Sequence, residues 1–199
     1  MFLNNELIFI HTPKSGGTSV HKLLSDNLGE TKTKGIIPPH ISYKDLKRSY
    51  PSYEIGQKTF AVVRNPFERL VSVYRHLNRP FKLQKFFGEN AEKVGAEIST
   101  FQDFITNFSL PDAVWQGKDH LTSQLEWVKE VDNIFDLSDT NGIANFLRGF
   151  GIKDQLPHLN KRKISSGFGK LYRTYYDDRA IALVEEKFKW EIDTFGYRF

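Results

Sequence analysis

The sequence predicts an α/β fold in which a central parallel sheet is flanked by helices. Two short runs rich in apolar and β-branched residues, Leu7–His11 and Thr59–Val63, are typical of buried strands. Each run is followed by apolar residues at helical spacing, within Ser19–Leu28 after the first and from Pro66 to Leu77 after the second. Strands that alternate with helices favour a parallel sheet, because each helix returns the chain across a face of the sheet.

The other elements are predicted from caps and from shorter apolar patterns. Pro66 suits the first turn of the second helix, where no amide hydrogen is needed. Ser42 can cap a short helix that reaches Ser49, and Ser138 or Asp139 can cap a later one. In chain order, the sequence then predicts a mostly helical, irregular segment 80–130, a weak strand Asn133–Leu137, a helix Thr140–Phe150 and a final helix Asp177–Trp190.

Length and composition are those of one soluble globular domain that spans residues 1–199. Of the 199 residues, 39% are hydrophobic and 26% are charged, a composition that can build a core. The absence of cysteine excludes a disulfide framework, a thiolate nucleophile and Cys-ligated metal sites. No apolar run approaches the roughly 18 residues that cross a bilayer, and the first residues do not resemble a signal peptide. We therefore expect a cytoplasmic protein without a membrane span.

The net charge of +4 hides an uneven distribution of basic residues. Segments 61–85 and 153–173 each hold six Lys or Arg and one acidic residue. Twelve bases less two acids leave +10 on these two segments, so the other residues carry −6. This concentration favours a small anionic ligand over a uniformly basic nucleic-acid surface, and we expect no nucleic-acid partner.

A glycine-rich stretch lies between the first predicted strand and its helix. Glycines let the backbone curl until several N–H groups converge on an anion, and the helix N-terminus adds its positive dipole end. Lys14 can reach a phosphoryl oxygen, and the Thr18 and Ser19 hydroxyls can donate hydrogen bonds to it. The alternative is a glycine-rich turn that binds nothing. The candidate phosphate-binding residues are Lys14, Ser15, Gly16, Gly17, Thr18 and Ser19.

This loop differs from the Walker A sequence of ATP-binding P-loops, G-x-x-x-x-G-K-[ST]. Lys14 precedes the glycines, and no lysine stands directly before Thr18. Arg64 follows the second predicted strand, where a metal-binding aspartate would be expected in an ATPase. The sequence therefore argues against bound Mg-ATP and predicts no metal site.

A second basic motif, Arg64–Tyr74, starts at the end of the second predicted strand and continues into the helix. If that helix begins near Pro66, Ser72 lies about 10 Å along its axis. A strand-end arginine and this serine can bind one phosphate group together, so Arg64 and Ser72 are candidate ligands. The alternative is an arginine in a first helical turn that is merely solvated.

The two motifs together resemble those of the carbohydrate sulfotransferases that use 3′-phosphoadenosine 5′-phosphosulfate (PAPS). Lys14–Ser19 after Pro13 is similar to the loop for the 5′-phosphosulfate in that family. Arg64–Tyr74 is similar to the motif for the 3′-phosphate and fits the pattern R-x-P-x-x-R-x-x-S-x-Y. His158–Lys163 resembles the basic loop that closes over the nucleotide, and Asp193–Tyr197 resembles the D-x-F-G-Y tail. The four matches occur in the family's order and span most of the chain.

This resemblance implies a P-loop-containing nucleotide-binding fold and transfer of a sulfuryl group from PAPS to a hydroxyl or amine of a glycan or glycoconjugate. It implies that Lys14–Ser19 bind the 5′-phosphosulfate, with Lys14 at the bridging oxygen. It also implies that Arg64 and Ser72 bind the 3′-phosphate together with Arg162 or Lys163. PAPS is then the cosubstrate and no metal is required. Two separate basic segments fit the phosphate groups of PAPS better than those of ATP.

The general base is sought chiefly among the six histidines. The segment His40–Tyr43 resembles the H-[VI]-S-[FY] segment of uronyl 2-O-sulfotransferases, which implies that His40 removes the acceptor proton. Imidazole suits this role at neutral pH. His120 is the rival base: it follows a loop with Trp115 and resembles a looser H-x-x-x-Q feature of the broad family, so both residues are candidates for acceptor binding. Glu68 is a further alternative, although its arginine neighbours favour an ion-pair role.

Two other functions stay open from the sequence, a P-loop phosphotransferase that uses ATP and a non-catalytic nucleotide-binding module. The position of Lys14 argues against the first, and the intact set of Lys14, Arg64 and Ser72 argues against the second. Segment 80–130 is expected to form an acceptor-side insertion. The identity of the acceptor and the oligomeric state are left open.

Overall fold

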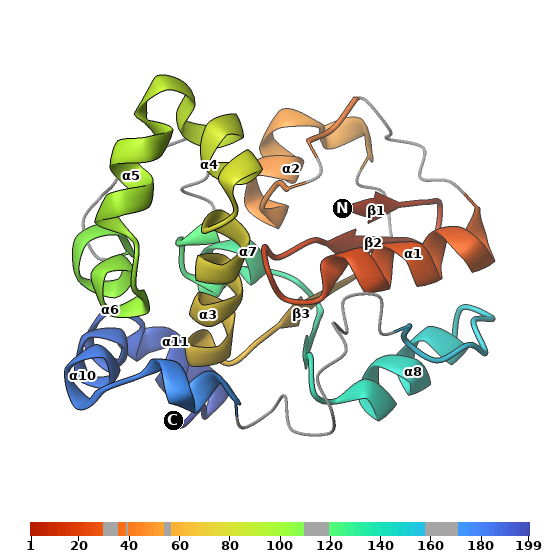
Figure 1. The fold of residues 1–199 in the computed structure, drawn as a ribbon. Coiled ribbons are helices and arrows are strands. Elements are labelled where there is room, and N and C mark those ends of the chain that lie inside the picture. The colour runs from red at the N-terminus through yellow and green to blue at the C-terminus, as the bar shows by residue number, and fades with distance from the viewer. Residues whose placement is uncertain (30–35, 39, 54–56, 110–119, 158–170) are drawn as a thin grey trace. The chain divides into compact units, whose positions relative to one another are not determined.

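The chain divides into two compact units in the computed structural model (Figure 1). Unit 1 comprises Met1–Arg64 and Gln124–Arg162, and unit 2 comprises Asn65–Ser123 and Lys163–Phe199. Each unit has a hydrophobic core of its own, so each is described by itself. The structure describes all residues except 30–35, 39, 54–56, 110–119 and 158–170.

Unit 1 contains a four-stranded sheet with the spatial order β1-β2-β3-β4. The strands β2, β3 and β4 pair in parallel, so the predicted α/β class with a parallel sheet is confirmed. An antiparallel strand, β1, pairs with β2 and is absent from the sequence prediction, because two residues are too few to show a pattern. The strands are β1 (Phe2–Leu3), β2 (Leu7–Ile10), β3 (Lys58–Val63) and β4 (Asn133–Asp136).

The helices of unit 1 begin where the sequence places caps. Ser42 caps α2 by accepting a hydrogen bond from the Asp45 N–H at 3.1 Å. Asp139 caps α8 by accepting one from the Gly142 N–H at 2.8 Å. The elements are α1 (Gly17–Leu28), α2 (Tyr43–Ser49), a 3-10 turn at Pro51–Tyr53, α7 (Gln124–Val128) and α8 (Thr140–Arg148).

One face of the sheet packs against α1 and α8. Side chains two residues apart on a strand point to the same face of the sheet. Leu7 and Phe9 of β2 and Phe60 and Val62 of β3 therefore share that face. These side chains belong to a hydrophobic cluster that packs β2 against α1. Its buried members are Phe2, Leu7, Phe9, Val20, Leu23, Leu24, Phe60, Val62, Ile143, Leu147, Ile152 and Leu156.

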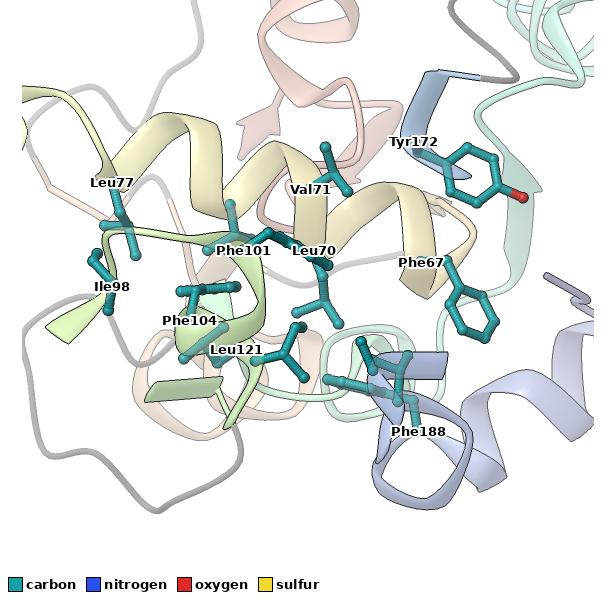
Figure 2. Packing of buried hydrophobic residues seen from close by; sticks show 14 residues of the cluster. Phe67, Leu70, Val71, Leu77, Ile98, Phe101, Phe104, Leu121, Tyr172 and Phe188 are labelled. Atoms are coloured by element: carbon teal, nitrogen blue, oxygen red, sulfur yellow. The ribbon is translucent and has the colours of Figure 1, made fainter. Parts of the chain in front are cut away.

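Unit 2 is helical in the residues that the structure describes. Figure 2 shows its core, in which Phe67 and Leu70 of α3 pack with Phe104, Leu121 and Phe188. The elements are α3 (Pro66–Leu77), α4 (Pro80–Phe87), a 3-10 turn at Gly88–Asn90, α5 (Ala91–Glu97), α6 (Phe101–Asp103), a π-helical turn at Phe104–Ser109, a 3-10 turn at Tyr172–Tyr175, α10 (Asp178–Lys187) and α11 (Lys189–Phe195).

The single final helix predicted from Asp177 to Trp190 is instead two helices, α10 and α11. Asp177, where the predicted helix begins, is the N-cap of α10, and Phe188 separates the two helices with φ −105° and ψ 21°. Val184 and Phe188 are both buried in the same core, so the apolar spacing continues through the break and cannot reveal it. Among the described residues, no helix is long and apolar enough to cross a membrane.

Candidate functional site

The loop that follows β2 turns sharply before α1 begins at Gly17. Lys14 has a φ of 65° and Gly16 a φ of 77°, both in the left-handed region. This conformation costs a non-glycine residue such as Lys14 roughly 1–2 kcal/mol and is concentrated at functional sites. The turn is closed by hydrogen bonds from the Ser15 N–H to the Thr12 carbonyl (3.4 Å) and from the Ser19 N–H to the Gly16 carbonyl (2.9 Å).

The amino end of α1 presents backbone N–H groups that no side chain caps. Gly16 is the N-cap residue, and the first turn of the helix holds no acidic residue. The first N–H groups of any helix lack carbonyl partners within it, and the helix dipole makes this end positive. The 12 residues of α1 align their peptide dipoles, so the amino end of this helix is suited to bind an anion.

The two glycines of the loop lie too close to their neighbours to carry a side chain. A Cβ atom on Gly16 would overlap the Leu137 side chain, and one on Gly17 would overlap the His11 ring. The His11 ring in turn stacks on Phe9, with centroids 5.9 Å apart and planes 22° apart. The glycines therefore allow the loop to lie directly against the body of unit 1.

The side chains of the loop differ in exposure and in partners. Thr18 is exposed and Lys14 is half-buried, whereas Ser15 and Ser19 are buried. The Ser15 hydroxyl donates a hydrogen bond to Gln124 Oε1 at 2.7 Å. The Ser15 hydroxyl therefore donates its proton to a group of the protein.

Arg64 is the first residue after β3, at the position that the sequence predicts. Its N–H donates to Gln124 Oε1 at 2.8 Å, and its carbonyl accepts from Gln124 Nε2 at 2.7 Å. Asn65 then caps α3 by accepting a hydrogen bond from the Phe67 N–H at 3.0 Å, and Pro66 occupies the first turn. The loop and Arg64 thus both lie at the carboxyl ends of parallel strands, where α/β proteins bind their ligands.

His40 lies beside the loop in unit 1. Its ring centroid is 4.3 Å from that of His11 and 6.3 Å from that of Trp127. Its Nδ1 is 3.1 Å from the His11 carbonyl oxygen. A carbonyl only accepts, so Nδ1 carries the proton and Nε2 is the nitrogen that can take one.

The other site candidates fall in unit 2 or outside the described residues. Ser72 is half-buried on α3. His120 stacks on His76, with centroids 5.7 Å apart and planes 20° apart. Among the described residues, no group of three or more His, Asp or Glu side chains is arranged to hold a metal ion. Outside the described residues lie Trp115, Arg162 and Lys163.

Arg69, a member of the second basic motif, is fully buried in unit 2. It donates hydrogen bonds to the carbonyls of His120 (3.0 Å) and Thr122 (3.1 Å), and its Nη2 lies 3.9 Å from Glu191 Oε2. Ser123 Oγ also donates to that carboxylate at 3.0 Å. Burial lowers the pKa of the Arg69 guanidinium, and the Glu191 carboxylate opposes the shift. This arginine therefore serves the interior of unit 2.

A model of the sulfotransferase family matches residues 1–198, and the chain therefore belongs to this family. The family and fold class predicted from the sequence motifs are thus confirmed. The chain is 26% identical over 153 residues to carbohydrate sulfotransferase 10 of Rattus norvegicus and 27% identical over 156 residues to that of Homo sapiens.

These matches cover 63% and 64% of this chain but 42% of each relative. Carbohydrate sulfotransferase 10 of Xenopus laevis is 23% identical over 239 aligned positions, which cover 98% of this chain and 65% of that protein. The chain thus spans less than two thirds of the length of these curated relatives. No solved structure matches it.

Proposed function

We propose that this chain transfers a sulfuryl group from PAPS to a hydroxyl or amine of a glycan or glycoconjugate. The observation that carries the proposal is the curled loop between β2 and α1, with left-handed Lys14 and Gly16, in a chain of the sulfotransferase family. The relatives named carbohydrate sulfotransferase support a carbohydrate acceptor. Family membership also favours sulfuryl transfer over phosphoryl transfer from ATP and over non-catalytic binding.

The residues at the carboxyl ends of β2 and β3 fit an anionic donor. The uncapped N–H groups of α1 and the Lys14 ammonium would bind the 5′-phosphosulfate. The Arg64 guanidinium would bind the 3′-phosphate. In this proposal Ser72, and Arg162 or Lys163, complete the 3′ subsite.

PAPS supplies the sulfuryl group: as the acceptor oxygen or nitrogen bonds to sulfur, the bond from sulfur to the bridging phosphate oxygen breaks and 3′-phosphoadenosine 5′-phosphate leaves. His40 takes the acceptor proton at Nε2, because its Nδ1 donates to the His11 carbonyl. Lys14 stabilises the negative charge that develops on the bridging oxygen. His120 is the alternative base, and with Trp115 it is assigned to acceptor binding.

The acceptor side is proposed to lie in segment 80–130, whose described part contains α4, α5 and α6. Labelled PAPS offered with sugars, glycolipids and small alcohols would identify the acceptor. The cytoplasmic location stays a prediction from the sequence, and the oligomeric state stays open.

Calorimetry with 3′-phosphoadenosine 5′-phosphate, the desulfated product, tests the proposed function. We expect binding at least about tenfold tighter than that of adenosine 5′-phosphate, because the 3′-phosphate adds charge-assisted hydrogen bonds. Lys14→Ala should weaken binding about tenfold or more, because the ammonium is lost from the 5′ subsite. Lys22→Ala is the matched control, since Lys22 is an exposed lysine of α1 that pairs with Asp26.

The alternatives give different results in the same experiment. Magnesium-dependent binding of ATP with no preference for a 3′-phosphate would support the ATP-using phosphotransferase. Absence of binding at millimolar 3′-phosphoadenosine 5′-phosphate would reject the proposed function.

A further inference from the structure

The Gln124 side chain connects the two parts of unit 1 that are assigned to the nucleotide. Gln124 is fully buried and is the first residue of α7. Its Oε1 accepts hydrogen bonds from Ser15 Oγ and from the Arg64 N–H, at 2.7 and 2.8 Å. Its Nε2 donates to the Arg64 carbonyl at 2.7 Å. One amide group thus joins the phosphate loop to the end of β3.

The partners fix which way this amide faces. The Arg64 N–H can only donate and the Arg64 carbonyl can only accept, so Oε1 must face the first and Nε2 the second. The Ser15 hydroxyl then donates its proton to Oε1. No other orientation of the amide satisfies both backbone groups.

The amide serves Arg64 as a neighbouring strand would. β2 pairs with β3 only up to Ile10, after which the chain leaves the sheet to form the loop. On the opposite side, the Leu137 N–H still donates to the Val63 carbonyl at 2.8 Å. Successive residues of a strand direct their backbone groups to opposite neighbours. The groups of Arg64 therefore face the side that β2 has left, and Gln124 occupies it.

We propose that Gln124 is a positioning residue that fixes the phosphate loop relative to Arg64 and so sets the spacing between the 5′ and 3′ subsites. The inference rests on the proposed function, because that function assigns the two subsites. Gln124 has no exposed surface, so it acts through Ser15 and Arg64 rather than by touching the ligand. Loss of its amide removes a partner from buried polar groups on both sides, which favours movement of the loop.

Calorimetry with 3′-phosphoadenosine 5′-phosphate on matched variants separates positioning from folding. We expect Gln124→Ala to weaken binding about 10- to 100-fold, the effect that loss of an orienting group has on metal-binding side chains. Asn133→Ala is the matched control: Asn133 Nδ2 also donates to a β3 carbonyl, that of Thr59 at 3.2 Å, toward the other end of the strand. The control should bind as the wild type does. Equal affinity of the two variants would overturn the inference.

Two milder variants keep the test decisive if Gln124→Ala fails to fold. Gln124→Glu keeps an acceptor for Ser15 but loses the N–H that faces the Arg64 carbonyl, and Ser15→Ala removes only the loop side of the connection. Each should weaken binding, with the melting temperature close to that of Asn133→Ala. If both bind as tightly as that control, the inference is wrong.

A double variant tests whether the Ser15–Gln124 bond itself is responsible. Ser15→Ala and Gln124→Ala break the same bond, so the double variant should bind about as weakly as Gln124→Ala alone. Fully additive losses would mean that the two residues act independently, which would contradict the connection.

Hydrogen exchange without ligand distinguishes failure of this inference from failure of the proposed function. Gln124→Ala should speed exchange of the amides of residues 12 and 14–19 and of Arg64 about tenfold over Asn133→Ala, whether or not nucleotide binds. If the wild type does not bind 3′-phosphoadenosine 5′-phosphate, the proposed function is rejected. If exchange in the loop is unchanged, the connection through Gln124 is rejected.

Discussion

At the scale of single residues, the backbone prepares His40 for its proposed role as a base. The His11 carbonyl engages Nδ1 at 3.1 Å and so selects the tautomer in which Nε2 can take a proton. The neighbouring Trp127 is buried, and its Nε1 has no hydrogen-bond partner among the described residues. The Trp127 ring packs edge-on against the His40 ring and restricts the position of the imidazole beside the loop.

Replacement of His40 should separate catalysis from nucleotide binding. In His40→Ala we expect turnover to fall about 10²- to 10⁴-fold, because the proton acceptor is lost. Affinity for 3′-phosphoadenosine 5′-phosphate should stay within about twofold, since the proposed role of His40 is to take the acceptor proton and not to bind the nucleotide. Initial rates with labelled PAPS and calorimetry measure the two quantities. His21→Ala is the control, because His21 lies on α1 and pairs with Ser25.

Two outcomes would contradict this assignment. A parallel collapse of nucleotide affinity in His40→Ala would place His40 in the cofactor subsite. Retained turnover would favour His120 as the base, and His120→Ala would then be the variant that loses activity.

The sequence predicts candidate residues for the chemistry but not how their partners orient them. Lys14 and Arg64 stand in local motifs whose residue types and order are informative by themselves. The bond between Ser15 and Gln124 joins residues 109 positions apart, and it arises only when α7 packs against the ends of β2 and β3. The H-x-x-x-Q pattern draws attention to Gln124. The spacing within one segment cannot predict which residue of another segment Gln124 contacts.

At the scale of elements, prediction succeeds where a local chemical rule marks the element. Ser42 and Asp139 cap helices, and the apolar runs become β2, β3 and β4. It fails at the break near Phe188, because a buried phenylalanine continues the apolar spacing through a residue whose φ and ψ are not helical. Tertiary packing therefore decides the details that local pattern leaves free.

Asp132 connects the start of β4 to the start of β3, and its charge should matter for stability. Its Oδ2 accepts from the Thr59 N–H and hydroxyl, both at 2.9 Å. The bond from the Thr59 backbone lowers the pKa of the Asp132 carboxyl. Because Asp132 is exposed and solvent screens its charge, Asp132→Asn should cost at most about 1 kcal/mol at pH 7. A pKa lowered by folding contributes stability above the unfolded value and loses it as pH falls through the folded value.

The melting temperatures of wild type and Asp132→Asn between pH 2 and pH 7 test this expectation. The difference in melting temperature should be largest at neutral pH. It should shrink once the pH falls below 3.8, the ordinary pKa of an aspartate carboxyl. Asp26→Asn is the control, since Asp26 forms an exposed ion pair with Lys22. A difference that stays constant down to pH 2 would show that geometry rather than charge is responsible.

At the scale of the whole molecule, basic residues that are close in the sequence lie in different surroundings. The net charge of +4 combines two basic segments, which carry +10, with a remainder that carries −6. In the first segment, Arg64 stands at the end of β3 in unit 1, whereas Arg69 is buried in unit 2 and faces Glu191. Composition alone cannot separate a guanidinium that is proposed to bind a ligand from one that is buried in a core, because burial is a property of the fold.

Removal of the Arg69 charge should destabilise the protein far more than removal of a surface arginine. In Arg69→Met the Glu191 carboxylate is left buried without its counter-charge, and two carbonyls lose their donor. We expect a loss of about 3–5 kcal/mol, against at most about 1 kcal/mol for Arg48→Met, whose exposed pair with Asp45 is the matched control. Urea unfolding gives both free energies.

A second variant assigns the cause of that loss. Glu191→Gln removes the carboxylate charge but leaves the Arg69 guanidinium bonded to the His120 and Thr122 carbonyls, so it should cost less than Arg69→Met. Each variant leaves one buried charge without its partner. Arg69→Met also removes the donors of two carbonyls, so its loss should be the larger. Equal and small losses in Arg69→Met, Glu191→Gln and Arg48→Met would mean that the buried pair contributes no more than a surface pair. Unit 2 would then depend on its apolar cluster alone.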